Sequence, residues 1–167
     1  MDHETFSAAV ERYGDIVTRL LLLRCRQPED ARDCFQSVFL KLLTCRTEFS
    51  DGDHIKAWLI RAAVHEAASV NRQFWRRNVV LLGDTPYPDG AAPDGSAGRE
   101  LLDELRALPE GQRDVLYLHY YEGYSVDELA RILNVRPGTV KSRLSRGRQA
   151  LKARLETEET AHEMGRI

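Results

Sequence analysis

Residues 124–155 read YSVDELARILNVRPGTVKSRLSRGRQALKARL and determine how the C-terminal part of this chain folds. Ser125, followed three residues later by Glu128, forms a capping box that predicts the start of a helix. Asn134 tolerates the left-handed backbone of a tight turn, and Pro137 suits the first position of a second helix. Two helices joined by so short a turn are typical of a helix-turn-helix motif, in which the second helix lies in the major groove of DNA.

Apolar residues at helical spacing predict the buried face of each helix in this motif. In the first helix they are Val126, Leu129, Ala130 and Leu133, and in the second they are Val140, Leu144, Gly147 and Leu151. We also expect the two helices to pack closely through Ala130 and Gly138, since neither residue has a bulky side chain. The residues that project from the opposite face of the second helix are Ser142, Ser145, Arg146 and Gln149.

The second helix of the motif carries charge of one sign. From Arg136 to Arg154 the sequence contains no Asp or Glu, and its charged residues are Arg136, Lys141, Arg143, Arg146, Arg148, Lys152 and Arg154. A helix that is only solvated usually mixes signs, so that ion pairs form between positions i and i+4. The pattern therefore favours a phosphate partner over a basic surface helix that binds nothing.

Composition limits the class of protein. The chain has 167 residues, of which 43% are hydrophobic and 30% charged, as in a soluble globular protein of one or two small domains. No apolar run reaches transmembrane length, and the N-terminal MDHETF lacks the pattern of a signal peptide. We therefore expect a cytoplasmic protein without membrane insertion.

The sequence carries no pattern of an enzyme. It lacks a glycine-rich phosphate loop and a credible nucleophile–base set, so we expect no catalytic residues and no cofactor. Cys25, Cys34 and Cys45 form no CxxC pair and are predicted to be free thiols in a reducing compartment. A zinc site that uses one of the five histidines is the less favoured alternative.

Upstream of the motif, the segment GDTPYPDGAAPDGSAG at 83–98 is rich in Pro, Gly, Asp and Ala and has no periodic apolar residue. It predicts a flexible acidic linker. We place an N-terminal domain at 1–78, the linker at 79–98, the helix-turn-helix domain at 99–155 and a tail at 156–167.

The N-terminal domain shows three helical patterns: one from about Glu4 to Arg24, one from Pro28, and one from near His54 to Arg76. RTEFSDGD at 46–53 separates the last two as a loop. The residues predicted to lie inward are Phe6, Val10, Tyr13, Val17, Leu20 and Leu21; then Phe35, Val38, Phe39, Leu42 and Leu43; then Trp58, Ala62, Ala63, Ala67, Val70 and Phe74. The fold class is therefore all-α, with two small helical domains.

The third of these helices has a polar outer stripe that ends beside aromatic residues. Its members are Arg61, His65, Ser69, Arg72 and Arg76, with Arg77, Phe74 and Trp75 at the end. Basic groups follow a phosphate backbone and aromatic rings stack on exposed bases, so the stripe is a second candidate nucleic-acid surface. The alternative is that Trp75 anchors the helix to the core and the arginines are solvated.

Three segments resemble the sigma-70 family of RNA polymerase initiation factors. DARDCFQSVFLKLL at 30–43 resembles its polymerase-binding helix, KAWLIRAAVHEAASVNRQFWRR at 56–77 its −10-reading helix, and 105–151 its −35-reading domain. Their order and the linker resemble the extracytoplasmic-function subgroup, which keeps domains two and four. The resemblance implies a promoter-recognition factor whose partners are core RNA polymerase, at its clamp helices and flap, promoter DNA and an anti-sigma protein.

The resemblance also implies site residues. The polymerase-binding set is Asp30, Asp33, Gln36, Ser37, Leu40 and Lys41, where Ser37 replaces the usual acidic residue. The −10 set is Ser50, Arg61, His65, Ser69, Arg72, Trp75, Arg76 and Arg77, and the loop 49–53 matches the segment that holds a flipped base. In the −35 set, Lys141, Ser142, Ser145 and Arg146 face the groove, while Arg136, Thr139, Arg143 and Arg148 lie nearer phosphates.

Two other classes of protein remain as alternatives. A stand-alone helix-turn-helix regulator needs a receiver or ligand pocket upstream, but the upstream part is helical without strand alternation. A protein-interaction adaptor does not explain the one-sign helix. The net charge of −2 predicts weak DNA binding by the free chain, as expected for a factor that depends on polymerase.

Overall fold

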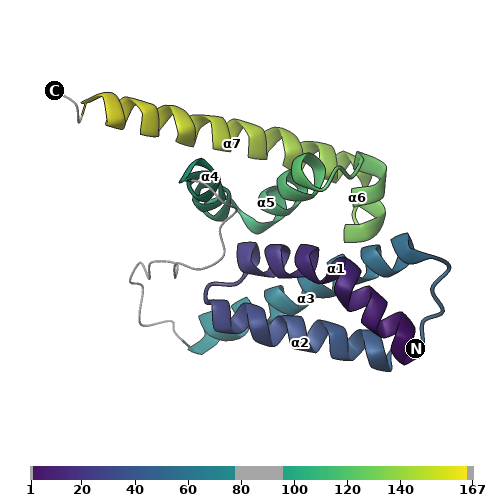
Figure 1. Cartoon of the computed structure of the whole chain (residues 1–167). Coiled ribbons are helices and arrows are strands. Elements are labelled where there is room, and N and C mark those ends of the chain that lie inside the picture. The colour runs from purple at the N-terminus through teal and green to yellow at the C-terminus, as the bar shows by residue number, and fades with distance from the viewer. Residues whose placement is uncertain (1, 78–95, 165–167) are drawn as a thin grey trace. The chain divides into compact units, whose positions relative to one another are not determined.

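A computed structural model describes residues 2–77 and 96–164, without the side chains of 75, 77, 96–100 and 158–164, and it is all-helical there (Figure 1). The chain divides into two compact units, Met1–Ala91 and Ala92–Ile167. Residues 78–95, which make up most of the predicted linker, lie outside the described residues.

The first unit contains α1 (His3–Arg24), α2 (Pro28–Thr44) and α3 (Gly52–Arg77), and each of these helices packs against the other two (Figure 1). Local sequence explains where they begin. The Asp2 carboxylate accepts a hydrogen bond of 2.9 Å from the Thr5 amide, and Pro28 occupies the first turn of α2. The loop predicted at 46–53 ends earlier, because Gly52 and Asp53 already belong to α3.

The core of this unit confirms most of the predicted inward faces. Tyr13, Val17, Leu20, Leu21, Val38, Phe39, Leu42, Ala63 and Ala67 are buried. Leu43 was wrongly placed inside, since it is 39% exposed. Leu59 and Ile60 of α3 were not among the predicted inward residues, yet they are fully buried, while Trp58 and Ala62 are half-buried. The true inward face of α3 is therefore rotated by about one residue.

The second unit contains α4 (Ser96–Arg106), α5 (Glu110–Leu116), a π-helical turn η1 (Tyr117–Tyr121), α6 (Val126–Leu133) and α7 (Pro137–Met164). The long α7 contacts α4, α5 and α6, as Figure 1 shows. In η1 the Glu122 amide donates to the Tyr117 carbonyl five residues back, which widens the turn. Gly123 then takes a φ of +78°, a conformation that favours glycine, and starts the turn into α6.

The predicted capping box and turn are present in the helix-turn-helix. The Ser125 amide donates to the Glu128 carboxylate at 2.8 Å, and the Glu128 amide donates to the Ser125 hydroxyl at 3.2 Å. Asn134 adopts the left-handed conformation with a φ of 52°, and α7 begins at Pro137. These short-range features fix the angle at which α7 leaves α6.

The close approach in this unit lies at Gly147 and not at Gly138. A Cβ atom built on Gly147 would lie 2.9 Å from Leu116 Cδ1, so α5 and α7 touch there with no room for a side chain. A Cβ atom on Gly138 would have no neighbour within 4 Å, so the expectation of tight packing at Gly138 is wrong. Val140 and Leu144 are buried as predicted.

Two boundaries differ from those read in the sequence. The helix α4 begins at Ser96, so 96–98 of the predicted linker are helical, which supplies the first turn that precedes Leu102 and Leu105. The predicted tail is helical from Glu156 to Met164, because α7 continues without a break and Lys152 pairs with Glu156 one turn later at 3.7 Å. Within the described residues, none of these helices is long and apolar enough to cross a membrane.

Candidate nucleic-acid and polymerase interfaces

The outer face of α7 brings together the side chains predicted to face a DNA groove. Lys141, Ser142, Ser145 and Arg146 are all exposed, while Val140 and Leu144 on the opposite face are buried against the rest of the unit. The burial of one face holds the other outward, so these four side chains project from a rigid helix. Such a surface offers hydrogen-bond donors to base edges without first having to become ordered.

The residues predicted to lie near phosphates fall into two groups. Arg136 and Arg148 are exposed, at the start of α7 and further along it. Thr139 and Arg143 are half-buried, and Arg143 packs over α5, where a Cβ on Gly111 would lie 3.1 Å from its Nε atom. Arg143 therefore braces α7 against α5, which leaves it less free to follow a backbone than the sequence predicted.

The predicted −10 stripe runs along one face of α3. Arg61, His65, Arg72 and Arg76 are exposed and Ser69 is half-buried, whereas the side chains of Trp75 and Arg77 lie outside the described residues. The neighbouring Phe74 is packed and half-buried, with the Arg26 guanidinium 4.9 Å from its ring centroid. The described part of the stripe is therefore a basic surface on a helix whose other face is in the core.

The loop before α3 is held by its own hydrogen bonds. The Asp51 carboxylate accepts a bond of 2.8 Å from the His54 amide and a second from the Ser50 hydroxyl at 3.0 Å. These bonds, the one from the His54 amide foremost, lower the pKa of Asp51. Ser50 itself remains exposed, and the Phe49 ring packs edge-on against Trp58 at 6.0 Å. The loop thus presents Ser50 from a fixed backbone.

The residues predicted to bind polymerase lie along α2. Asp33, Gln36, Leu40 and Lys41 are exposed, and the apolar side chain of Leu40 is 61% exposed. Ser37 and Asp30 are half-buried. Burial, followed by the neighbouring Asp33 and Glu29 carboxylates, raises the pKa of Asp30.

Some neighbours of these surfaces were not found in the sequence. The Glu66 carboxylate of α3 pairs with Lys41, and the Tyr120 hydroxyl accepts a hydrogen bond of 3.0 Å from Arg148. The aromatic run His-Tyr-Tyr at 119–121 is the sequence feature that could have indicated the contact between Tyr120 and Arg148. Across the described side chains, no three His, Cys, Asp or Glu residues gather as a metal site would require.

Comparison with known proteins finds one family model over each of the two units. Residues 9–78 match the family described as Sigma-70 region 2, and residues 98–151 match Sigma-70, region 4. The chain is 29% identical to RNA polymerase sigma factor CarQ of Myxococcus xanthus, over 89% of this chain and 88% of that protein. It is 32% identical to ECF RNA polymerase sigma factor SigM of Mycobacterium tuberculosis, over 90% of this chain and 76% of that protein.

Solved structures share the fold. The sigma factor RpoE of Bartonella quintana, crystallised with the anti-sigma factor NepR, superposes with a TM-score of 0.77 at 22% identity, over 92% of this chain and 98% of that chain. CnrH, solved in complex with the cytosolic domain of CnrY, gives a TM-score of 0.68 at 23% identity, over 93% and 90% of the two chains.

These matches cover both compact units, and the class of protein is that of a non-enzymatic transcription initiation factor. The chain belongs to the sigma-70 family, with region 2 and region 4, and its relatives are extracytoplasmic-function sigma factors over most of its length. Sigma factors of this family bind core RNA polymerase.

Proposed function

We propose that this sigma factor reads the −35 promoter element with the outer face of α7 and the −10 element with α3 and the loop before it. The observation that carries the proposal is the set of four exposed side chains, Lys141, Ser142, Ser145 and Arg146, on a helix that has no acidic residue before Glu156. A bidentate bond from an arginine such as Arg146 to guanine is worth about 1–3 kcal/mol of discrimination between bases.

Promoter selection by the reconstituted holoenzyme tests the −35 assignment. Core polymerase with the wild-type chain should initiate at promoters selected from a random library, and Arg146→Ala should flatten the preference at one or two −35 positions. Lys152→Ala is the matched control, because Lys152 is exposed on the same helix two turns further on. Its loss should weaken binding without changing base preference. An unaltered −35 preference in Arg146→Ala would refute the groove assignment.

The −10 assignment rests on the exposed basic stripe of α3, in particular Arg61, His65 and Arg72, and on the fixed loop that presents Ser50. Basic side chains along a helix neutralise successive phosphates, and the loop offers a backbone surface to an extruded base. Permanganate footprinting of the open complex tests this. Arg72→Ala should reduce melting at −10 while leaving −35 protection intact.

We further propose that the exposed side of α2 docks on the clamp helices of the largest polymerase subunit, and that region 4 contacts the flap. Asp33, Gln36 and the exposed Leu40 supply polar and apolar contacts on one helix. Asp33→Ala with Gln36→Ala should weaken binding to core enzyme. Asp15→Ala removes an exposed carboxylate from α1 and should leave that binding unchanged.

We also propose that an anti-sigma protein regulates this chain and that the chain acts in the cytoplasm. A sigma factor of the same fold has been solved in complex with an anti-sigma factor, which supports such a partner for this chain. The chain would act in the cytoplasm, where polymerase is found. Affinity purification with mass spectrometry tests the partner, because a captured anti-sigma protein should be displaced by core polymerase.

A further inference from the structure

One surface contact in the second unit joins Arg148, a predicted −35 residue, to Tyr120, which belongs to none of the predicted sets. Arg148 on α7 donates a hydrogen bond from Nη1 to the hydroxyl oxygen of Tyr120 on η1, over 3.0 Å and between residues 28 apart in the chain. Both side chains are exposed, and Tyr120 is 61% exposed. A tyrosine ring held so far into water by a charged partner needs an explanation beyond packing.

The backbone and the neighbouring ring fix the position of Tyr120. The π-helical turn buries Tyr117 and turns Tyr120 outward. The His119 ring lies edge-on to Tyr120 at 4.9 Å, and its Nδ1 atom is 2.6 Å from the Tyr124 carbonyl oxygen. Because a carbonyl only accepts, this Nδ1 carries the proton and the His119 ring is held in place. The position of the Tyr120 ring is therefore fixed by η1 and by the neighbouring His119 ring.

The hydrogen-bonding capacity of the pair defines the ligand. A phenol has one donor and two acceptor sites, and Arg148 fills one of the acceptor sites. The Tyr120 O–H is left to donate, and the Arg148 guanidinium keeps further N–H groups. Among the described residues, no carboxylate pairs with Arg148. Two adjacent groups that both donate, one of them cationic, are suited to an anionic oxygen such as that of a phosphodiester.

The place of the pair along α7 agrees with this ligand. Lys141, Ser145 and Arg148 lie on one stripe of the helix, and Arg148 is about 10 Å further along the axis than Lys141. Residues at the N-terminal end of a recognition helix contact base edges, so a residue two turns later on the same stripe lies nearer the backbone. A donor that reaches over from η1 widens the contact beyond the helix itself.

We propose that Tyr120 and Arg148 together form a phosphodiester-binding site that holds one backbone phosphate beside the −35 element. Tyr120 donates its O–H to the phosphate and orients the Arg148 guanidinium toward the same group. This inference rests on the proposed −35 function of α7, and it adds a binding residue outside the recognition helix.

The test uses the holoenzyme and a promoter duplex at fixed salt, with Tyr120→Phe, Arg148→Gln and the double variant. Tyr120→Phe keeps the ring and should weaken binding about two- to tenfold, equally for all −35 sequences, as expected for one lost hydrogen bond. The double variant should bind like Arg148→Gln alone, because the two residues act on one phosphate. Tyr121→Phe, an equally exposed tyrosine whose ring stacks on Tyr117, is the matched control and should bind like wild type.

A methylphosphonate scan of the duplex identifies the ligand directly. One neutral linkage should reduce wild-type affinity, and the same linkage should matter less to Tyr120→Phe. Normal binding by Tyr120→Phe, or a loss that depends on base identity, would overturn the inference. Weaker binding of Tyr120→Phe to core polymerase in the absence of DNA would also overturn the inference, since Tyr120 would then face a protein. The inference would likewise be overturned if millimolar inorganic phosphate inhibited DNA binding while no single linkage of the duplex was sensitive. If the wild type itself lacks a −35 preference, the proposed function has failed instead.

Discussion

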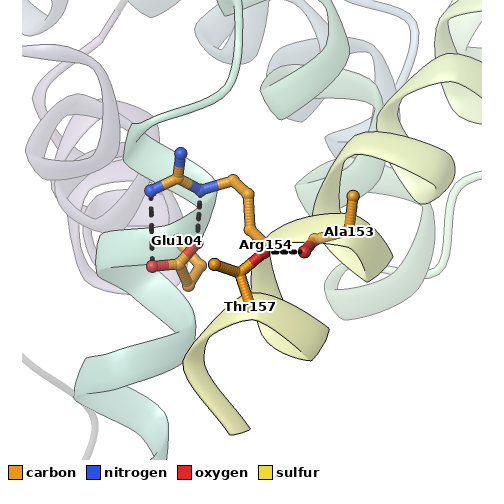
Figure 2. Close-up of polar contacts among 4 residues, drawn as sticks. All are labelled: Glu104, Ala153, Arg154 and Thr157. Carbon is orange, nitrogen blue, oxygen red and sulfur yellow. Dashed lines mark hydrogen bonds and ion pairs between the residues drawn. The ribbon is translucent and has the colours of Figure 1, made fainter. Parts of the chain in front are cut away.

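Arg154 of α7 forms a two-bond ion pair with Glu104 of α4, and this pair ties the ends of the second unit together (Figure 2). The Nη2 atom of Arg154 lies 3.4 Å from Glu104 Oε1, and Nε donates to the other carboxylate oxygen. The Glu104 side chain is 7% exposed and that of Arg154 45%. The carboxylate is therefore buried, while its partner can still reach water.

This unequal burial predicts unequal mutant effects. Arg154→Ala leaves a buried carboxylate without its partner and should destabilise the second unit by about 1–3 kcal/mol. Glu104→Gln should cost less, because the amide oxygen can still accept one bond from Arg154 and the remaining N–H groups of the guanidinium can turn to solvent. Hydrogen exchange of the α4 amides measures both, and equal protection in the two variants would contradict this account.

Two glycines of α7 should respond in opposite directions. Gly138 has open space around it and lacks the positive φ of Gly123, so Gly138→Ala should stabilise the second unit by about 0.4–1 kcal/mol. Gly147→Val should destabilise it by about 1–3 kcal/mol, because its Cβ would lie 2.9 Å from Leu116 Cδ1.

Urea unfolding followed by far-UV circular dichroism measures these shifts. Both tryptophans, Trp58 and Trp75, lie in α3 of the first unit, so tryptophan fluorescence serves as an internal control that should not move. A gain in stability for Gly147→Val would show that α5 and α7 do not meet as closely as the structure has them.

The part of the fold that sequence predicts best is the part with short-range causes. Ser125, Glu128 and Asn134 act within a few residues of one another, and their capping and turn follow from local chemistry alone. The inward face of α3 was harder to predict. The large ring of Trp58 suggests that it lies in the core, whereas Leu59 and Ile60 are the residues that fill the core. Which of two adjacent apolar residues enters the core depends on the partner helices.

The thiols offer a prediction on burial. Cys25 and Cys34 are each 1% exposed, with their sulfurs 3.9 Å apart, while Cys45 is half-buried. The hydrogen bond from Cys25 to Cys34 lowers the pKa of Cys34, and the same bond, together with burial, raises the pKa of Cys25. Since reagents must first reach the sulfur, Ellman's reagent should label one thiol per chain quickly and two only on unfolding.

Cys45→Ser tests the assignment, because it should remove the fast phase and leave the slow one. Cys34→Ser should retain the fast phase. Three thiols that react at one rate in the native protein would contradict the burial of the Cys25–Cys34 pair.

The candidate site shows the same limit of sequence reasoning. The exposed face of α7 follows from the helical period, so Ser142 and Arg146 could be placed in advance. The Tyr120–Arg148 contact could not, because the residues are 28 positions apart and the π-helical turn shifts the register of Tyr120 without a periodic signal. The pairing of Lys41 with Glu66 likewise depends on how α2 and α3 pack.

Acid should loosen the start of α3 through Asp51. The bond from the His54 amide, helped by that from Ser50, lowers the Asp51 pKa below its ordinary value of 3.8. The folded chain therefore binds fewer protons here than the unfolded chain does, so the contribution to stability is complete above about pH 5 and is lost as pH falls through the folded-state pKa.

Carbon-detected NMR titration should find the Asp51 midpoint below 3.8, with protection of the His54 amide falling over the same range. Asp51→Asn keeps an acceptor but cannot titrate, so its His54 protection should no longer follow pH there. The control Asp53→Asn, at the second residue of α3, should retain the pH dependence of the wild type. A midpoint at or above 3.8 for Asp51 would show that its carboxylate does not cap the helix.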